Sequence, residues 1–360
     1  LLASSAASDV YKRQDYLDSR TYTGNHSRNE MSNGVLKVDD ERSWTFLTSN
    51  ILRLQYSFGE HNLNGLVGQE WYERHTRSSR IEMYDQIIAG ERNVGGFSKQ
   101  GDKTNPGVIP TGAERESGSF SVFSEVNYNY AGKYMASASF RTDGSTNFGK
   151  DNRYGTFYSF SGSWLVSREA FMARQDVVSN LKLRMSYGTS GKEAGMDYLN
   201  YTLYSTSNTT FDYYRNHPVY QSAYGATINQ LGNDQLSWET AYNLNIGVDV
   251  ALLNNRISLS ADWYKRRNSD LIMSTTLPAA NGVGRQYQNV GEMENRGVEL
   301  VLNTHTMKGE DFNWFTTLTF SYNDNELTKL DQEKLTRSGY KTFYEGDNIC
   351  LLYTSDAADE

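Results

Sequence analysis

The sequence is poor in the residues that several classes of protein require. Its 360 residues include one cysteine, Cys350, and four prolines, which excludes a disulfide scaffold and a cysteine-based zinc site. It contains no run of about 18 apolar residues, which excludes a membrane-spanning helix. The formal net charge of −8 argues against a nucleic-acid binder, because such a protein needs a basic surface for the phosphate backbone.

Both ends of the chain differ in character from the rest. Leu1–Gln14 and Cys350–Glu360 resemble translated sequencing-adapter readthrough, and neither joins a periodic segment. We therefore expect both ends to be non-native, as fusion scars are. It follows that the native part contains no cysteine and is expected to be a piece of a longer protein.

Apolar and polar residues alternate with a period of two along most of the remaining chain. In Trp238–Val250 the even positions are mostly apolar or aromatic and the odd positions mostly polar. This alternation indicates β-strands with one apolar and one hydrated face, and about ten such segments occur. They lie at 49–58, 61–73, 120–130, 134–141, 158–166, 181–187, 238–250, 257–263, 298–303 and 314–322.

The connections between these segments alternate in length. Short turns fall at 59–60, 131–133, 254–255 and 308–310, and long polar stretches at 76–117, 143–155, 190–236 and 270–295. The exception is 167–180, which predicts a single helical turn. Short turns on one side and long loops on the other are typical of an outer-membrane β-barrel.

Strand length favours the same architecture. At about 3.3 Å per residue, Trp238–Val250 extends roughly 43 Å, and with a tilt of about 45° it rises roughly 30 Å, enough to cross a membrane. Aromatic residues also fall at two levels, as the girdles of such barrels do, although Tyr and Trp favour strands in any case. One level lies near the short turns (Tyr128, Tyr130, Tyr134, Trp164, Trp314) and the other near the long loops (Trp238, Tyr242, Trp263, Tyr322).

Five blocks of sequence carry a family signature. Arg141–Gly155 reads RTDGSTNFGKDNRYG and resembles the motif R-x-D-G-S-S-x-F-G-x-x-N-R-x-G of the SusC/RagA family of TonB-linked outer-membrane transporters. The other blocks follow in the family's order: SNLKLRMSYGTSG at 179–191, LSWETAYNLNIGVD at 236–249, LNNRISLSADWYKRRNSDL at 253–271 and NVGEMENRGVELVL at 289–302. Asn147 and Tyr158 depart from the family pattern, which leaves the local loop geometry open.

The residues that carry these matches are interpreted as structural. They are Arg141, Asp143, Gly144, Ser145, Phe148, Gly149, Arg153, Gly155, Trp238, Glu239, Asn289, Gly291 and Gly297.

The resemblance implies an all-β fold. It would be an antiparallel transmembrane β-barrel portion, with about ten strands of a barrel of about 22, short periplasmic turns and long extracellular loops. Residues 15–42 would be an extracellular loop remnant and 43–349 the partial barrel.

The resemblance also implies a location and partners. The protein would lie in the outer membrane of a Gram-negative bacterium, in contact with outer-membrane lipid. A plug and a TonB-contacting region would precede this segment, and a SusD-like surface lipoprotein would cover it. The cargo would be an oligosaccharide or a peptide.

No constellation of residues predicts catalysis, a cofactor or a metal site. Gly144–Lys150 nearly matches a P-loop, but Asp151 stands where Ser or Thr should bind magnesium, and the segment lies between two strands. The five histidines form no H-x-x-x-H pair, so a metal site is not expected. Glu239 and Asp249 occupy the polar face of one strand and are expected to line a hydrated lumen.

The loop at 197–224 is the candidate contact for cargo. It holds seven tyrosines, and tyrosines flanked by Asn, Asp and Arg suit stacking on sugar rings. The weak candidates for substrate binding are Tyr213, Tyr214 and Tyr220. Packing of the loop on its neighbours and docking of the lid protein are alternative uses of the same side chains.

Two other classes of protein fit part of the pattern. A soluble all-β glycan-binding or adhesin module would need shorter strands and a dry core between two sheets, which the serine- and asparagine-rich polar faces do not supply. A barrel enzyme would need a Ser/His or paired-acid constellation, and none is found. The sequence therefore favours a nutrient importer without enzymatic activity.

Overall fold

A computed structural model describes residues 2–23, 35–88, 93–102, 105–106, 111–193, 195–205, 227–278, 283–309, 312–330, 335–337 and 341–348. Long strands dominate these residues. They are β1 (Leu2–Thr23), β2 (Val35–Phe58), β3 (His61–Gln86), β6 (Thr111–Tyr130), β7 (Tyr134–Ser145), β8 (Tyr154–Leu165), β9 (Val178–Lys192), β12 (Glu239–Leu252), β13 (Ile257–Thr276), β14 (Arg285–Lys308) and β15 (Asn313–Leu330).

The remaining elements are short. They comprise strands β4 (Phe97–Asp102), β5 (Asn105–Pro106), β10 (Leu203–Ser205), β11 (Thr227–Gln230), β16 (Leu335–Arg337) and β17 (Lys341–Phe343), and the 3-10 turns η1 (Val94–Gly96), η2 (Val166–Arg168) and η3 (Ala170–Met172). Turns η2 and η3 occupy the segment in which the sequence predicted one helical turn.

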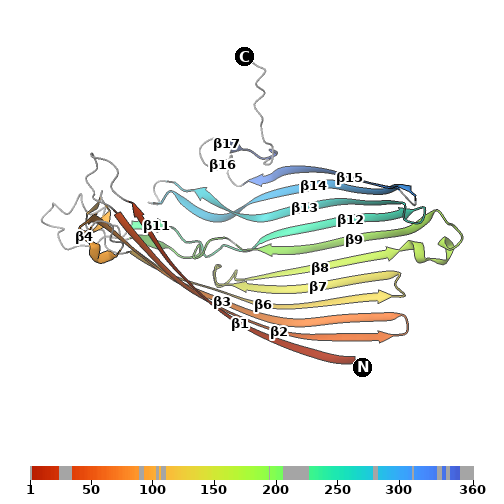
Figure 1. Cartoon of the computed structure of the whole chain (residues 1–360), viewed down its shortest axis with the longest axis horizontal. Helices are drawn as coiled ribbons and strands as arrows, with labels where there is room; N and C mark the ends of the chain where they lie inside the picture. The colour runs from red at the N-terminus through yellow and green to blue at the C-terminus, as the bar shows by residue number, and fades with distance from the viewer. Residues whose placement is uncertain are drawn as a thin grey trace, which may run out of the picture.

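The long strands form a single curved, open antiparallel sheet (Figure 1). Its order is β1-β2-β3-β6-β7-β8-β9-β12-β13-β14-β15, so each long strand pairs with the next one along the chain. The tight turns gather at one end of the sheet, at the right in Figure 1, and the longer connections at the other. The ten strands expected from the alternation all occur, and β1 adds to them.

The register aligns apolar residues with apolar residues across the sheet. One row runs through Trp164, Leu183, Val248, Ala261, Leu300 and Phe320 on six successive strands. The adjacent row, on the opposite face, runs through Ser163, Arg184, Gly247, Asp262, Glu299 and Ser321. Because successive side chains of a strand point to opposite faces, the sheet has one apolar and one polar face.

Nothing within the described residues covers the apolar face. Phe160 is 56% exposed, Ile246 47% and Phe320 56%, although a soluble protein rarely leaves an apolar patch of this extent uncovered. An apolar face without a second layer suits a lipid surrounding, as expected from the sequence.

The strands run farther than the alternation indicated. β3 reaches Gln86, β6 begins at Thr111, and β13 and β14 reach Thr276 and Arg285. The long loops expected at 76–117 and 270–295 are therefore partly strand. Side chains there are polar on both faces, so the alternation fades while the backbone ladder continues.

The beginning of the chain shows the same difference. We expected a loop remnant at 15–42, but 15–23 belong to β1 and 35–42 to β2. The backbone of β1 from residue 2 onward pairs with β2. Because backbone pairing does not depend on the origin of the side chains, the non-native origin of 1–14 stays a prediction, as does that of 350–360, which lie outside the described residues.

The apolar face ends sharply on the strands β13 to β15. Trp263, Val298 and Tyr322 form its last row toward the long loops. The next row on the same face holds Lys265, Arg296 and Asp324. Ion pairs join Arg296 to Asp324 at 2.8 Å and Lys265 to Glu294 at 2.9 Å.

At the end with the tight turns, aromatic residues are tied to the β8–β9 connection. Tyr134 and Trp164 stack with ring centroids 6.2 Å apart. The Tyr134 hydroxyl donates to Glu169 Oε1 at 2.5 Å and Trp164 Nε1 donates to the same oxygen at 3.1 Å. These hydrogen bonds lower the pKa of Glu169 below its ordinary value.

Candidate functional site

β7 and β8 are the shortest long strands of the sheet. Each has 12 residues, whereas β6 has 20 and β14 has 24. The wall is therefore lower above β7 and β8. Segments 146–153, 195–202 and 231–238 meet there, and their side chains form a cluster that we call the loop cluster.

A small apolar core holds the loop cluster together. Phe148, Leu199 and Leu236 are buried, one from each segment, and Trp238, Ile272 and Tyr287 pack against them. The Trp238 ring lies 5.2 Å from Phe148 and 5.8 Å from Phe157, and its Nε1 donates to the Arg153 carbonyl at 3.0 Å. We expected Trp238 in an aromatic girdle, and that prediction is wrong, since its ring is enclosed by loop residues.

The RTDGSTNFGKDNRYG block supplies one side of the loop cluster. The Ser145 hydroxyl donates to Glu193 Oε1, and Asn147 Nδ2 donates to the same oxygen at 2.7 Å. Gly149 lies so close to Asp234 that a Cβ would collide with the Asp234 carbonyl. Asn147, one of the two departures from the family pattern, thus takes part in this contact.

The rest of that block shapes the ends of β7 and β8. Arg141 donates to Asp143 Oδ1 at 2.6 Å and to Ser121 Oγ at 3.0 Å. A Cβ on Gly144 would collide with the ring of Tyr154, and one on Gly155 with Phe157 and Trp238. A side chain at either glycine would therefore displace an aromatic ring.

Asn289 and Glu239 link the later strands to the loop cluster. Asn289 Oδ1 accepts from Ser237 N at 2.9 Å, and its Nδ2 donates to the Ser237 and Asp270 carbonyls at 2.9 and 2.7 Å. Glu239 Oε1 accepts from Ile272 N at 2.8 Å. Glu239 is thus a loop anchor and not the free lumen carboxylate expected from the sequence.

Two motif glycines of β14 lie at close approaches. A Cβ on Gly297 would collide with Tyr264 and with the Tyr322 carbonyl, and one on Gly291 would press on Met273. The motif residues therefore make structural contacts, and the structure brings nine of the thirteen into or next to the loop cluster: Ser145, Phe148, Gly149, Arg153, Gly155, Trp238, Glu239, Asn289 and Gly291. Tyr213, Tyr214 and Tyr220 lie outside the described residues.

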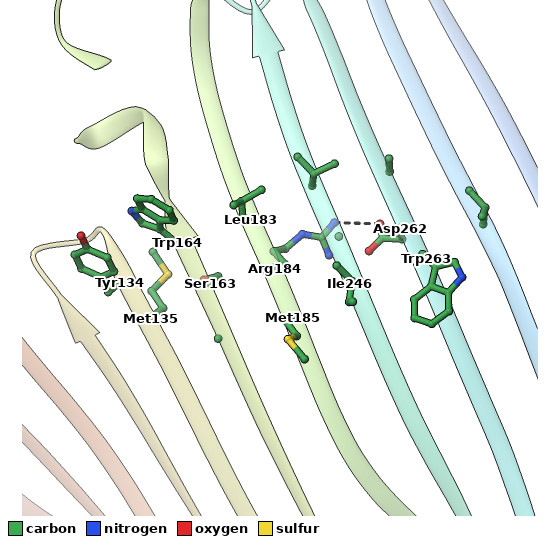
Figure 2. Close-up of a pocket in the computed structure, with 15 residues that line it drawn as sticks. Tyr134, Met135, Ser163, Trp164, Leu183, Arg184, Met185, Ile246, Asp262 and Trp263 are labelled. Atoms are coloured by element: carbon green, nitrogen blue, oxygen red, sulfur yellow. Dashed lines mark hydrogen bonds and ion pairs between the residues drawn. The ribbon is translucent and has the colours of Figure 1, made fainter. Parts of the chain in front are cut away.

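The polar face carries an ionic cluster that the sequence reading missed. Arg184 donates to Asp249 at 2.8 and 3.0 Å and to Asp262 Oδ2 at 3.0 Å, as Figure 2 shows for Asp262. Ser260 Oγ donates to Asp249 Oδ1 at 2.7 Å. The guanidinium passes over Gly247, where a Cβ would meet it. The cross-strand alignment of Arg184, Gly247 and Asp262 would have been the signal, but it needs the register.

Two hollows lie on the opposite faces of the same wall. On the polar face, a hollow of about 480 Å³ is lined by side chains such as Asn64, Asn127, Ser137, Ser161 and Lys182. On the apolar face, a hollow of about 700 Å³ has Trp164, Met185, Ile246 and Trp263 in its lining (Figure 2). The polar one offers amide and hydroxyl groups to water or cargo, and the apolar one offers only hydrocarbon.

The described residues hold no cluster of three or more His, Cys, Asp or Glu that could bind a metal ion. None of the helices described is long and apolar enough to cross a membrane. The P-loop-like segment lies between β7 and β8. It leads into a strand, and Phe148 at its centre is buried, so its geometry is that of a packed hairpin.

The two-faced curved sheet, with an ionic polar side and an uncovered apolar side, is the wall of an outer-membrane β-barrel. The model of the family "TonB dependent receptor-like, beta-barrel" matches residues 3–348. The chain belongs to this family and thus to the outer-membrane proteins of Gram-negative bacteria.

Relatives and solved structures agree with this assignment. The chain is 34% identical over 287 residues to TonB-dependent receptor P3 of Formosa agariphila, covering 79% of this chain and 27% of that protein. It is 34% identical over 212 residues to TonB-dependent receptor SusC of Bacteroides thetaiotaomicron, covering 58% and 21%. The structure of the RagAB peptide transporter matches with a TM-score of 0.78 and 26% identity, covering 95% of this chain and 36% of that one.

These matches confirm the resemblance to the SusC/RagA family. The chain spans roughly a quarter to a third of the length of the proteins it matches.

Proposed function

We propose that this chain is part of a TonB-dependent importer that carries oligosaccharides or peptides across the outer membrane. The observation that carries the proposal is the two-faced wall of a family member, because a polar inner face lets hydrophilic cargo pass while the apolar face meets lipid. Among the relatives, one is named SusC and the matched structure is titled a peptide transporter, which supports these two cargo classes.

Within such an importer, this chain supplies wall, lumen lining and outer loops. The Arg184–Asp249–Asp262 cluster ties β9, β12 and β13 together on the lumen side, and the loop cluster braces the wall above β7 and β8. None of these residues has a catalytic role in the proposal. Energy would come from TonB acting on a region outside this chain.

Contact with cargo is proposed for the outer loops. Tyr213, Tyr214 and Tyr220 remain the candidates on sequence grounds, because an exposed tyrosine combines a flat apolar ring with a hydrogen-bonding hydroxyl. A SusD-like surface lipoprotein is the proposed partner on the same side, since SusC and RagAB are the relatives matched.

The test is uptake by cells. Cells that lack the full-length receptor gene are complemented with that gene, and uptake of fluorescent oligosaccharides and fluorescent peptides is measured in strains with and without TonB. We expect receptor-dependent uptake of one class, and its loss without TonB. Uptake that is equal with and without the receptor, or that persists without TonB, would contradict the proposal.

The soluble adhesin is not favoured. An adhesin sandwich buries the apolar face of one sheet against a second sheet, but here residues such as Leu54, Phe160 and Phe320 stay about half exposed. Detergent-dependent extraction of the full-length protein from an outer-membrane fraction checks this, because a soluble adhesin would appear in the aqueous fraction.

A further inference from the structure

A third hollow lies at the loop end of β3, β6, β7 and β8. It has a volume of about 450 Å³, and its lining includes Trp71, Glu73, Glu116, Phe120, Tyr154 and Tyr201. We call it the rim pocket. Its place in the register decides which side of the wall it serves.

The rim pocket opens on the outward, lipid-side face. Trp71 is opposite Phe120, Phe120 is opposite Gly144, and Gly144 is opposite Tyr154. Following β3 by steps of two from Trp71 leads to Val67, an exposed member of the apolar face, and side chains two apart share a face. A solute in the lumen would face the other side of this wall.

The rim pocket also lies at the level where the apolar face ends. On β3, Trp71 is followed on the same face by Glu73 and His75, and on β6, Phe120 is preceded by Gly118 and Glu116. The change from aromatic to charged side chains repeats what Trp263 and Lys265 show on β13. Aromatic rings of barrels mark the membrane–water interface, so the pocket lies at the level of the lipid headgroups.

The rim pocket is built from backbone contacts as well as side chains. The Tyr198 hydroxyl, from the loop at 195–202, accepts from Glu116 N at 2.5 Å. Thr146 N donates to the Gly118 carbonyl at 3.0 Å, and Gly118 N donates to Thr146 Oγ1 at 2.9 Å. The positions of its walls are therefore set by hydrogen bonds that need no ligand.

The side chains of the rim pocket suit a sugar ring. Trp71 is 55% exposed, Tyr154 63% and Tyr201 54%, so three aromatic faces are available for stacking. Glu73 and Glu116 offer carboxylate oxygens, which accept hydrogen bonds from hydroxyl groups. The same two carboxylates repel a phosphate group, so the fitting ligand is a neutral or amine-bearing sugar.

We propose that the rim pocket binds a sugar of an outer-leaflet glycolipid. The acyl chains of that lipid would lie along the apolar face directly below, where Val67, Val122 and Phe140 are exposed. A single amphiphile thus satisfies both the aromatic and carboxylate-lined pocket and the hydrocarbon beneath it. The site is separate from the lumen and therefore from the proposed path of the cargo.

The test uses the full-length receptor that carries this chain, purified in detergent and stripped of lipid. Dissociation constants are measured for lipooligosaccharide, for lipid A without core sugars, and for free core oligosaccharide. Lipooligosaccharide should bind at least tenfold more tightly than either of the other two, because only it fills both the pocket and the apolar face.

The variant Trp71→Ala/Tyr154→Ala should remove the preference for lipooligosaccharide over lipid A and leave cargo uptake unchanged. The control Trp263→Ala/Tyr322→Ala removes a tryptophan and a tyrosine of the same face and level, away from the rim pocket, and should keep the preference. If the aromatic variant does not fold, Glu73→Gln/Glu116→Gln replaces it with side chains of equal size and should weaken the preference.

Three results would overturn the proposal. Equal affinity of the unchanged receptor for lipooligosaccharide and lipid A would show that acyl chains alone are bound. Free core oligosaccharide that binds as tightly as lipooligosaccharide would make the ligand a soluble sugar. A preference that survives substitution of the rim pocket would place the sugar elsewhere.

Discussion

Placing a charge on the apolar face should damage the protein far more than placing it on the polar face one residue away. Ile246 is 47% exposed, and it lies between Met185 and Trp263 of the neighbouring strands. It also lies near the middle of the 14-residue β12. With about 3.3 Å per residue and a tilt of about 45°, roughly 16 Å of the strand's rise lies on either side.

An arginine at position 246 cannot reach water across that distance. Arginine on the lipid face at the midplane of a barrel costs about 2–4 kcal/mol, which corresponds to roughly a 30- to 700-fold loss in the folding equilibrium. Asn245 lies between Ser186 and Tyr264 on the polar face, so Asn245→Arg should change the folding free energy little.

The assay is refolding of the full-length receptor from urea into lipid vesicles. The folded fraction is read from its heat-modifiable gel mobility across a urea series. Ile246→Arg should shift the midpoint strongly and Asn245→Arg weakly. Equal shifts for the two variants, or a larger shift for Asn245→Arg, would refute the facing derived from the register.

Three further predictions address the loops. Gly149→Ala should destabilise the loop cluster by about 1–3 kcal/mol through overpacking and speed its proteolysis, whereas Gly195→Ala, with open space around it, should not; equal proteolysis would contradict the close approach. A cysteine at Tyr213 should react with an impermeant thiol reagent on intact cells and one at Asn254 only after the outer membrane is opened; the reverse pattern would invert the sidedness. The lowered pKa of Glu169 means that its stabilising hydrogen bonds are complete above its unfolded value of 4.5 and are lost as pH falls through the folded value; thermal unfolding of Glu169→Gln should therefore depend less on acid pH than that of the unchanged protein.

Much of the fold could be predicted because a lipid-facing strand leaves a mark in the sequence. Runs such as Trp238–Val250 alternate because one face meets hydrocarbon and the other meets water, and this period also gives the facing of each residue. Tight turns between such runs then require antiparallel neighbours. The strand order, the open sheet and the two faces follow from these local patterns.

Strand length beyond the membrane could not be predicted in the same way. At the loop ends of β3 and β14 both faces are polar, so the side chains carry no period, although the backbone ladder extends to Gln86 and begins at Arg285. Backbone hydrogen bonds are insensitive to which polar side chains surround them. The alternation therefore reports the height of the apolar band and not the length of the strand.

The sequence by itself determined the class of fold, the facing of the strands and the family, because these depend on local periodicity and on short motifs. Only the tertiary structure decided which loops meet: Phe148, Leu199 and Leu236 pack together from three separate segments, and Trp238 leaves the expected girdle to join them. Such contacts depend on the relative heights of neighbouring strands. Those heights are set by backbone register across the whole sheet, which no single stretch of residues records.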